Sequence, residues 1–163
     1  WRGRVGWRGS GGGGGGKLHT SQSEELISPG DASWMREFCG AKVLIAEDDT
    51  GGRLLVERAL RLEGHEVIAV EDGELALEML EAHDGAFDLL LSDIRMPAMT
   101  GIELAHAAAV RWPDLRIQLM TGYAAQREAA EDLASIIVGV IEKPFSLAEI
   151  RRHLGRLLPT PLR

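Results

Sequence analysis

Five polar side chains have the types and positions that phosphoryl chemistry needs. Each follows a short apolar run, and in chain order they are Glu47, Asp48, Asp93, Thr121 and Lys143. A carboxylate is rarely placed at the end of a buried run unless it is paired or bound to a metal. Three carboxylates in one cleft repel each other unless a cation joins them, and Mg²⁺ suits oxygen ligands of this kind. A carboxylate nucleophile, a divalent ion, a lysine and a hydroxyl would together form an aspartyl phosphate, with Asp93 exposed and reactive.

Each of these residues also has an ordinary structural interpretation. An aspartate after a strand is more often a turn residue or a helix cap, and this applies equally to the run "EDD" at 47–49. A single lysine such as Lys143 is usually a solvated surface charge, and Thr121 alone is a loop hydroxyl. The joint pattern favours chemistry, because four of the five expected strands end in the residue types that one mechanism requires.

Alternating strand and helix patterns position these residues. Strands are expected at 42–46, 66–70, 87–92, 115–120 and 136–141. Helices are expected at 53–64, 74–83, 100–111, 124–134 and 146–158. Two of the helices begin with capping boxes, "TGIE" from Thr100 and "SLAE" from Ser146. Apolar runs without strict alternation predict a doubly wound α/β domain with a five-stranded parallel sheet in the order 2-1-3-4-5. Strands one and three would then be neighbours, which brings Glu47, Asp48 and Asp93 together at the carboxyl edge.

The domain is expected at residues 41–158, between two segments of different character. Residues 1–40 contain six consecutive glycines and no apolar periodicity, which predicts disorder. Met35 is a candidate start of translation, in which case the residues before it would not be native; a flexible arm is the alternative. Residues 159–163 would form a short tail.

The composition of the chain restricts the expected cellular location of the protein and the kinds of partner it is expected to bind. The net charge is −7, and residues 41–163 carry 13 Lys and Arg against 21 Asp and Glu. An acidic body repels a phosphate backbone, so direct nucleic-acid binding is not expected. No run is long and apolar enough to span a membrane, and no secretory signal is present. The single cysteine, Cys39, fits a reducing compartment, and the cytoplasm is therefore expected.

The motifs "VLIAEDD", "DLLLSDIRMPAMTG", "MTGYA" and "EKPF" resemble those of receiver domains of two-component response regulators, which have a flavodoxin-like (CheY-like) fold. The resemblance covers about residues 42 to 158. It implies that Asp93 is the phosphoacceptor for a histidine kinase or phosphotransfer protein. It further implies an Mg²⁺ site formed by Asp93, by Asp48 directly, by Glu47 through water and by the backbone carbonyl of Arg95. The residues that hold the phosphoryl oxygens would be Thr121 and Lys143, the latter followed by a cis bond to Pro144.

One position departs from the family pattern. Receivers often carry Tyr or Phe three residues before the lysine as a rotameric switch, and this chain has Val140 there. Tyr123 lies two residues after Thr121, and we expect it either to report phosphorylation instead or to shield the phosphoryl group; the alternative is a partly exposed packing ring. Tyr123 and Arg95 occupy the positions that tune aspartyl-phosphate lifetime in the family.

No output module is recognised, so a regulatory phosphoacceptor rather than an enzyme is expected, signalling by protein–protein contact. The family resemblance implies a partner surface over residues 124–158. The runs "LIAEDD" and "MTGYA" most resemble CpdR-like single-domain receivers, which prime a cytoplasmic protease for its substrates. One rival, a nucleotide- or flavin-binding enzyme, would need a glycine fingerprint where "EDDTGG" stands. Another, an Mg²⁺-dependent phosphatase, typically has a second aspartate at the place of Arg95.

Overall fold

The computed structural model describes residues 40–158, in which five parallel strands form one sheet in the order β2-β1-β3-β4-β5. The strands are β1 (Lys42–Ala46), β2 (Glu66–Val70), β3 (Leu89–Asp93), β4 (Arg116–Thr121) and β5 (Gly139–Glu142). The strand in the middle of the sheet, β3, is buried along its whole length. This burial explains why its sequence is apolar without alternation. The predicted fold class and strand order are confirmed.

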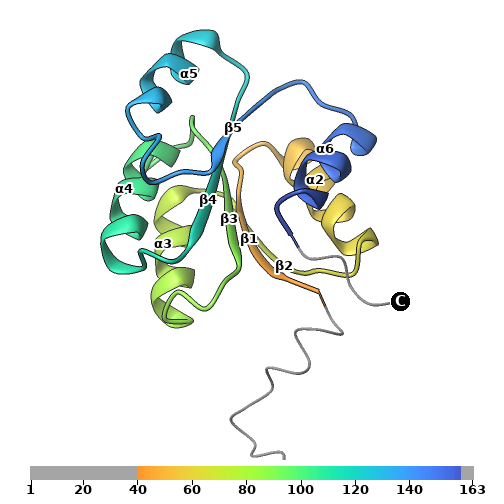
Figure 1. The fold of residues 1–163 in the computed structure, drawn as a ribbon, viewed down its shortest axis with the longest axis horizontal. Helices are drawn as coiled ribbons and strands as arrows, with labels where there is room; N and C mark the ends of the chain where they lie inside the picture. The colour runs from red at the N-terminus through yellow and green to blue at the C-terminus, as the bar shows by residue number, and fades with distance from the viewer. Residues whose placement is uncertain (1–39, 159–163) are drawn as a thin grey trace, which may run out of the picture. The chain divides into compact units, whose positions relative to one another are not determined.

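Helices cover both faces of the sheet (Figure 1). They are α2 (Thr50–Leu62), α3 (Gly73–Ala82), α4 (Gly101–Arg111), α5 (Ala124–Glu131) and α6 (Leu147–Gly155). Helices α2 and α6 lie on one face, and α3, α4 and α5 lie on the other. Each face buries its own apolar layer, and alternate residues of β1 point to opposite layers. Leu44 belongs to the layer under α3, α4 and α5, whereas Val43 and Ile45 belong to the layer under α2 and α6.

Polar side chains cap the first turn of four of the five helices within residues 40–158. The two capping boxes are present as predicted, at Thr100 for α4 and at Ser146 for α6. Helix α2 begins three residues earlier than expected, because the Asp49 carboxylate accepts a hydrogen bond of 2.7 Å from the Gly52 amide. Asp49 is thus a helix cap, and it belongs to the framework around the acidic pair at 47–48.

Three strand predictions were wrong at their boundaries. The fourth strand was expected at 115–120 and is Arg116–Thr121, so Thr121 is its last residue. The third strand was expected at 87–92, but Asp88 instead binds the backbone of Lys42, and the strand extends through Asp93. The fifth strand was expected at 136–141 and begins at Gly139. The amides of Ile136 and Ile137 donate to the carbonyl of Leu133, which continues the turn after α5. These two isoleucines pack against the core from that turn, so their apolar character did not indicate a strand.

Four helices also end earlier than their apolar patterns predicted. Helix α2 ends at Leu62 and α3 at Ala82, whereas 64 and 83 were expected. Helix α5 ends at Glu131 and α6 at Gly155, whereas 134 and 158 were expected. Residues 1–39 and 159–163 lie outside the described part of the chain, and so do the predicted disordered segment, the candidate start Met35 and the tail. Within residues 40–158, no helix combines the length and the apolar character needed to cross a bilayer.

Candidate functional site

The carboxyl ends of β1 and β3 bring three acids together. Ala46 and Ser92 are partners in the parallel pairing, so the residues that follow them, Glu47 and Asp93, leave the sheet side by side. Ligand atoms of Glu47, Asp48 and Asp93 all lie within 4.8 Å of one another. Glu47 is fully buried and Asp48 is exposed, so the cluster spans the distance from the core to solvent. Three carboxylate oxygens in this arrangement fit the donor set of a hard divalent cation.

Asp93 is less accessible than the sequence suggested. It was expected to be an exposed residue after the strand, but it is the last residue of β3 and only 8% exposed. The backbone that follows passes against the start of α4, where a Cβ on Gly101 would meet the Asp93 carbonyl oxygen at 2.1 Å. The Gly101 amide donates to the Ile94 carbonyl at 2.8 Å across this close approach. A glycine at 101 therefore lets α4 pack directly beneath the acid.

Lys143 brings the one basic side chain that contacts the carboxylates of this cluster within residues 40–158. It follows β5, and its amide donates to the Thr121 carbonyl at 2.8 Å. Its Nζ lies 3.2 Å from Asp93 Oδ2 and also forms an ion pair with Glu47. The Lys143–Pro144 peptide bond is cis, as the resemblance implied. The lysine thus crosses from β5 to the ends of both β1 and β3.

The electrostatics of the cluster follow from burial and from the small number of cations. Burial raises the pKa of the Glu47 carboxyl to about 7, the hydrogen bond from Lys143 opposes this, and the charge of Asp93 adds to it. Burial acts to lower the pKa of Lys143, but the two carboxylates that it contacts outweigh burial and raise it. Lys143 contacts the carboxylates of Glu47 and Asp93, so its one positive charge does not balance the whole acidic cluster, and a cation would offset the remaining negative charge.

Thr121 lies at the site, but its hydroxyl is turned to other partners. The side chain is 1% exposed, and the hydroxyl lies 2.7 Å from Gln126 Oε1 and 3.2 Å from the Tyr123 carbonyl oxygen. The Tyr123 amide in turn donates to Thr121 Oγ1 at 3.1 Å. Gln126 was not among the predicted site residues. Nothing in a helical glutamine five positions after a threonine distinguishes it from a surface residue.

The two residues expected to tune the site contact each other. The Arg95 guanidinium lies over the Tyr123 ring, 5.5 Å from its centre, and the tyrosine is 57% exposed. Val140 is half-buried and packs against the core layer under α5. Met96 and Met99, in the loop after Asp93, pack against the same layer.

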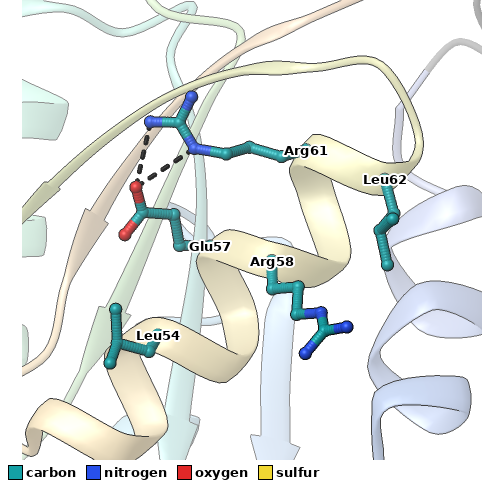
Figure 2. Close-up of a pocket in the computed structure, with 5 residues that line it drawn as sticks. All are labelled: Leu54, Glu57, Arg58, Arg61 and Leu62. Atoms are coloured by element: carbon teal, nitrogen blue, oxygen red, sulfur yellow. Dashed lines mark hydrogen bonds and ion pairs between the residues drawn. The ribbon is translucent and has the colours of Figure 1, made fainter.

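Two surface hollows lie outside the acidic cluster. One, of about 350 Å³, lies on the outer side of α2 and is lined by Leu54, Glu57, Arg58, Arg61 and Leu62. Figure 2 shows these side chains along the helix, with Arg61 bonded to Glu57. The second, of about 240 Å³, lies between α5 and β5, with Val140 in its lining. Neither hollow contains a predicted phosphoryl-binding residue.

The order of the sheet and the polar residues at its carboxyl edge define a CheY-like α/β domain, and comparison with known proteins identifies its family. The sequence model of the response regulator receiver domain family matches residues 43–155 of this chain. The chain belongs to this family, whose members are the receiver domains of two-component response regulators.

The relatives place the domain in proteins of several lengths. The response regulator receiver protein CpdR of Brucella abortus is 38% identical over 117 residues, which cover 72% of this chain and 96% of that protein. The response regulator FleR of Pseudomonas aeruginosa is 39% identical over 122 residues, and the match covers 72% of this chain but only 25% of FleR. The sensor kinase CckA of Brucella abortus is 33% identical over 118 residues, 72% of this chain and 12% of the kinase.

Solved structures agree with the fold. The chemotaxis response regulator CheY4 of Vibrio cholerae has a TM-score of 0.63 at 31% identity, covering 72% of this chain and 98% of that one. The response regulator TrrA of Thermotoga maritima, solved in complex with Mg²⁺ and beryllofluoride, has a TM-score of 0.61 at 29% identity, covering 71% of this chain and 97% of that one.

Proposed function

We propose that Asp93 accepts a phosphoryl group from a histidine kinase or a histidine phosphotransfer protein. The observation that carries this proposal is the meeting of Glu47, Asp48 and Asp93 within 4.8 Å, with Lys143 Nζ 3.2 Å from the Asp93 carboxylate. Membership of the receiver family supports the same reaction class. The kinase segments that match this chain support a two-component partner, and they leave its identity open.

In the proposed reaction, a carboxylate oxygen of Asp93 attacks the phosphorus of a phosphohistidine. A P–O bond to Asp93 forms while the P–N bond breaks, and the electron pair of that bond stays with the imidazole, which takes up a proton. Lys143 offsets charge on the phosphoryl oxygens from the position where it already contacts Asp93. The Thr121 hydroxyl would donate to a phosphoryl oxygen after turning away from its present partners.

The acids fit Mg²⁺ as the cofactor. We assign Asp48 and Asp93 as direct ligands, Glu47 as a ligand through water, and the backbone carbonyl of Arg95 as the remaining protein ligand. The ion would offset negative charge on the transferring group. The solved complex of TrrA with Mg²⁺ and beryllofluoride shows that a relative binds both, which supports this assignment.

We further propose that the Arg95–Tyr123 pair sets how long the aspartyl phosphate lasts. The stacked side chains come from the loops after β3 and β4, and both loops begin at site residues. Val140 lacks the aromatic ring that reports phosphorylation in many receivers, so Tyr123 would take over that task. If Tyr123→Ala changes neither phosphate lifetime nor partner affinity, this role for the tyrosine is wrong.

The downstream partner is proposed to bind the surface over 124–158. Of its arginines, Arg127 is paired with Glu142 and Arg151 with Glu63, whereas Arg152 is exposed. Glu128, Glu131 and Asp132 add negative charge to the same surface. A partner with a mixed-charge surface would therefore fit better than nucleic acid. The cytoplasmic location, the absence of an attached output module and the downstream role of a CpdR-like receiver stay predictions.

Beryllofluoride, which mimics a phosphoryl group, tests the proposed function. Wild-type protein should bind it only in the presence of Mg²⁺, and Asp93→Asn should not bind it at all. Circular dichroism of Asp93→Asn would show that the fold is kept. Mg²⁺-independent binding, or equal binding by Asp93→Asn, would overturn the assignment of Asp93.

The same preparation tests the two rival functions. A receiver should turn over no phosphate ester, whereas an Mg²⁺-dependent phosphatase would release phosphate continuously from p-nitrophenyl phosphate. A nucleotide or flavin enzyme would bind its cofactor, but the acidic residues after β1 oppose a pyrophosphate at that position. A pull-down that compares wild type, Asp93→Ala and beryllofluoride-loaded protein would then identify the partner.

A further inference from the structure

The hydroxyl of Thr121 is already engaged in this structure, and its partner lies on helix α5. The distance from Thr121 Oγ1 to Gln126 Oε1 is 2.7 Å, the shorter of the two donor contacts of this hydroxyl. Its lone pair accepts from the Tyr123 amide at 3.1 Å. A hydroxyl has one hydrogen and can fully serve one acceptor at a time. Thr121 therefore cannot hold Gln126 and a phosphoryl oxygen together.

We propose that Gln126 is a positioning residue that competes with the phosphoryl group for the Thr121 hydroxyl. The inference rests on the proposed function, in which Asp93 is phosphorylated and Thr121 donates to the phosphoryl group. In the unphosphorylated protein, Gln126 holds the hydroxyl toward α5. On phosphorylation the hydroxyl turns to the phosphoryl oxygen, and the amide of Gln126 is released.

The direction of this competition follows from the two acceptors. A charged phosphoryl oxygen is a stronger acceptor than a neutral amide oxygen, so the hydroxyl moves when the phosphoryl group arrives. The move sacrifices the contact with Gln126 in a place where Thr121 is buried from water. The free energy of the Thr121–Gln126 hydrogen bond must therefore be given up when a phosphoryl group binds, which lowers the affinity of the site. Removing the acceptor on Gln126 should tighten binding.

The release would act on α5 because Gln126 lies in its first turn. Tyr123, at the N-cap of α5, provides no side-chain cap, so the contact with Thr121 is a specific polar tie between this turn and the site. Arg127 ties the same turn to Glu142 at the surface. Breaking the inner tie would loosen the start of the helix that lines the hollow beside β5. Coupling of the site to α5 through Gln126 does not need an aromatic ring at position 140, where this chain has valine.

Gln126→Met tests the proposal because methionine keeps the length of the side chain and its helix propensity but lacks the amide acceptor. In the presence of Mg²⁺, beryllofluoride should bind this variant about fivefold more tightly than wild type, which corresponds to about 1 kcal/mol, the typical net value of one hydrogen bond. Introduced into Thr121→Ala, the same change should have no effect, because the hydroxyl under competition is absent. A general structural effect of the substitution would persist in both backgrounds.

Arg127→Met is the matched control on the neighbouring residue of α5. It removes the surface ion pair with Glu142 and leaves the Thr121–Gln126 contact in place. Its affinity for beryllofluoride should equal that of wild type. An equal gain in Arg127→Met and Gln126→Met would overturn the proposal, since loosening of α5 would then explain both.

The remaining outcomes separate this inference from the function on which it rests. If wild type binds beryllofluoride with Mg²⁺ and Gln126→Met binds it no more tightly, Gln126 does not compete and the proposed function stands. If wild type does not bind it at all, both fail together. A gain in Gln126→Met that persists in Thr121→Ala would overturn the competition while confirming that the site binds the mimic.

Discussion

The two ends of the parallel sheet differ in how their polar and charged side chains are paired. At the amino end, the Asp88 carboxylate accepts from the Lys42 amide at 2.7 Å, and His65 Nδ1 accepts from the Ala41 amide at 2.9 Å. Each of these two side chains provides a hydrogen-bond acceptor for a backbone amide at this end. At the carboxyl end, three acids lie within 4.8 Å of one another, and the ammonium group of Lys143 is ion-paired with two of them, Glu47 and Asp93. The same strands therefore carry a satisfied end that supports the fold and an under-neutralised end that is available for chemistry.

Removing a lysine from each end should separate these roles most clearly. Lys143→Met takes away the ammonium group next to Asp93, so phosphorylation by acetyl phosphate should slow about 100-fold, the typical effect of losing one preorganised charge partner. Mg²⁺ should bind this variant more tightly, because the competing cation is gone; calorimetry measures this.

Lys42→Met is the control from the amino end. Its Nζ contacts His83 and lies over the ring of Phe87, away from the acids. The phosphorylation rate of this variant should match that of wild type. A loss of similar size in both lysine variants would contradict the contrast between the two ends.

Part of this contrast between the two ends could be predicted from the sequence. The alternation of strand and helix patterns along the chain predicted the fold with its strand order. It thereby predicted the meeting of Glu47, Asp48 and Asp93, because parallel strands end at a common edge. The capping boxes were readable because they depend on local spacing. Residues 136–137 were misread as strand, since a partly buried turn that packs against the core and a strand can have the same apolar composition.

The parts that the sequence did not reveal depend on orientation. The polar residues at the strand ends indicated that Thr121 lies at the site, but only the structure shows that its hydroxyl is turned to Gln126. The burial of Asp93 and the close approach of α4 to its backbone at Gly101 are both results of tertiary packing. The ion pair of Lys143 with Glu47 is likewise a meeting of distant segments.

At the amino end, Asp88→Ala should lower stability without changing the reaction. The substitution leaves the Lys42 amide without its carboxylate acceptor, in a partly buried position. The free energy of unfolding should fall by about 1–2 kcal/mol, the cost of leaving a buried donor unsatisfied. Urea denaturation measures this, and Asp88→Asn, which keeps an acceptor oxygen, should lose less. A slower phosphorylation of folded Asp88→Ala would show that the two ends are coupled.

At the carboxyl end, Asp93→Asn should abolish phosphorylation and yet increase stability. The change removes the negative charge of Asp93, which lies within 4.8 Å of two other acids, and keeps the shape of the side chain. Relief of repulsion should exceed the lost contact with Lys143, so the free energy of unfolding should rise by about 1 kcal/mol. The same urea titration checks this in Mg²⁺-free buffer. A less stable Asp93→Asn would mean that the acids are already balanced without a cation.

The smallest effect should be a pH dependence that comes from His65. Burial lowers the pKa of this histidine below 6.5, although the charges of Glu63 and Asp88 oppose the shift. Between the folded pKa and 6.5 the unfolded chain binds more protons, so the contribution to stability is full above pH 6.5 and is lost as the pH falls through this window. Protonation would also turn Nδ1 from the acceptor of the Ala41 amide into a donor.

Comparison of variants isolates that contribution from the other titrating groups. Burial and the charge of Arg156 also lower the pKa of His153, and the raised pKa of Glu47 acts with the opposite sign, so the wild-type profile contains all three effects. The difference in unfolding free energy between wild type and His65→Gln should shrink between pH 7.5 and 5.5, by up to about 1 kcal/mol, because only wild type loses its hydrogen bond there. A constant difference for His65→Gln would show that the amino end stays satisfied even when this histidine is charged.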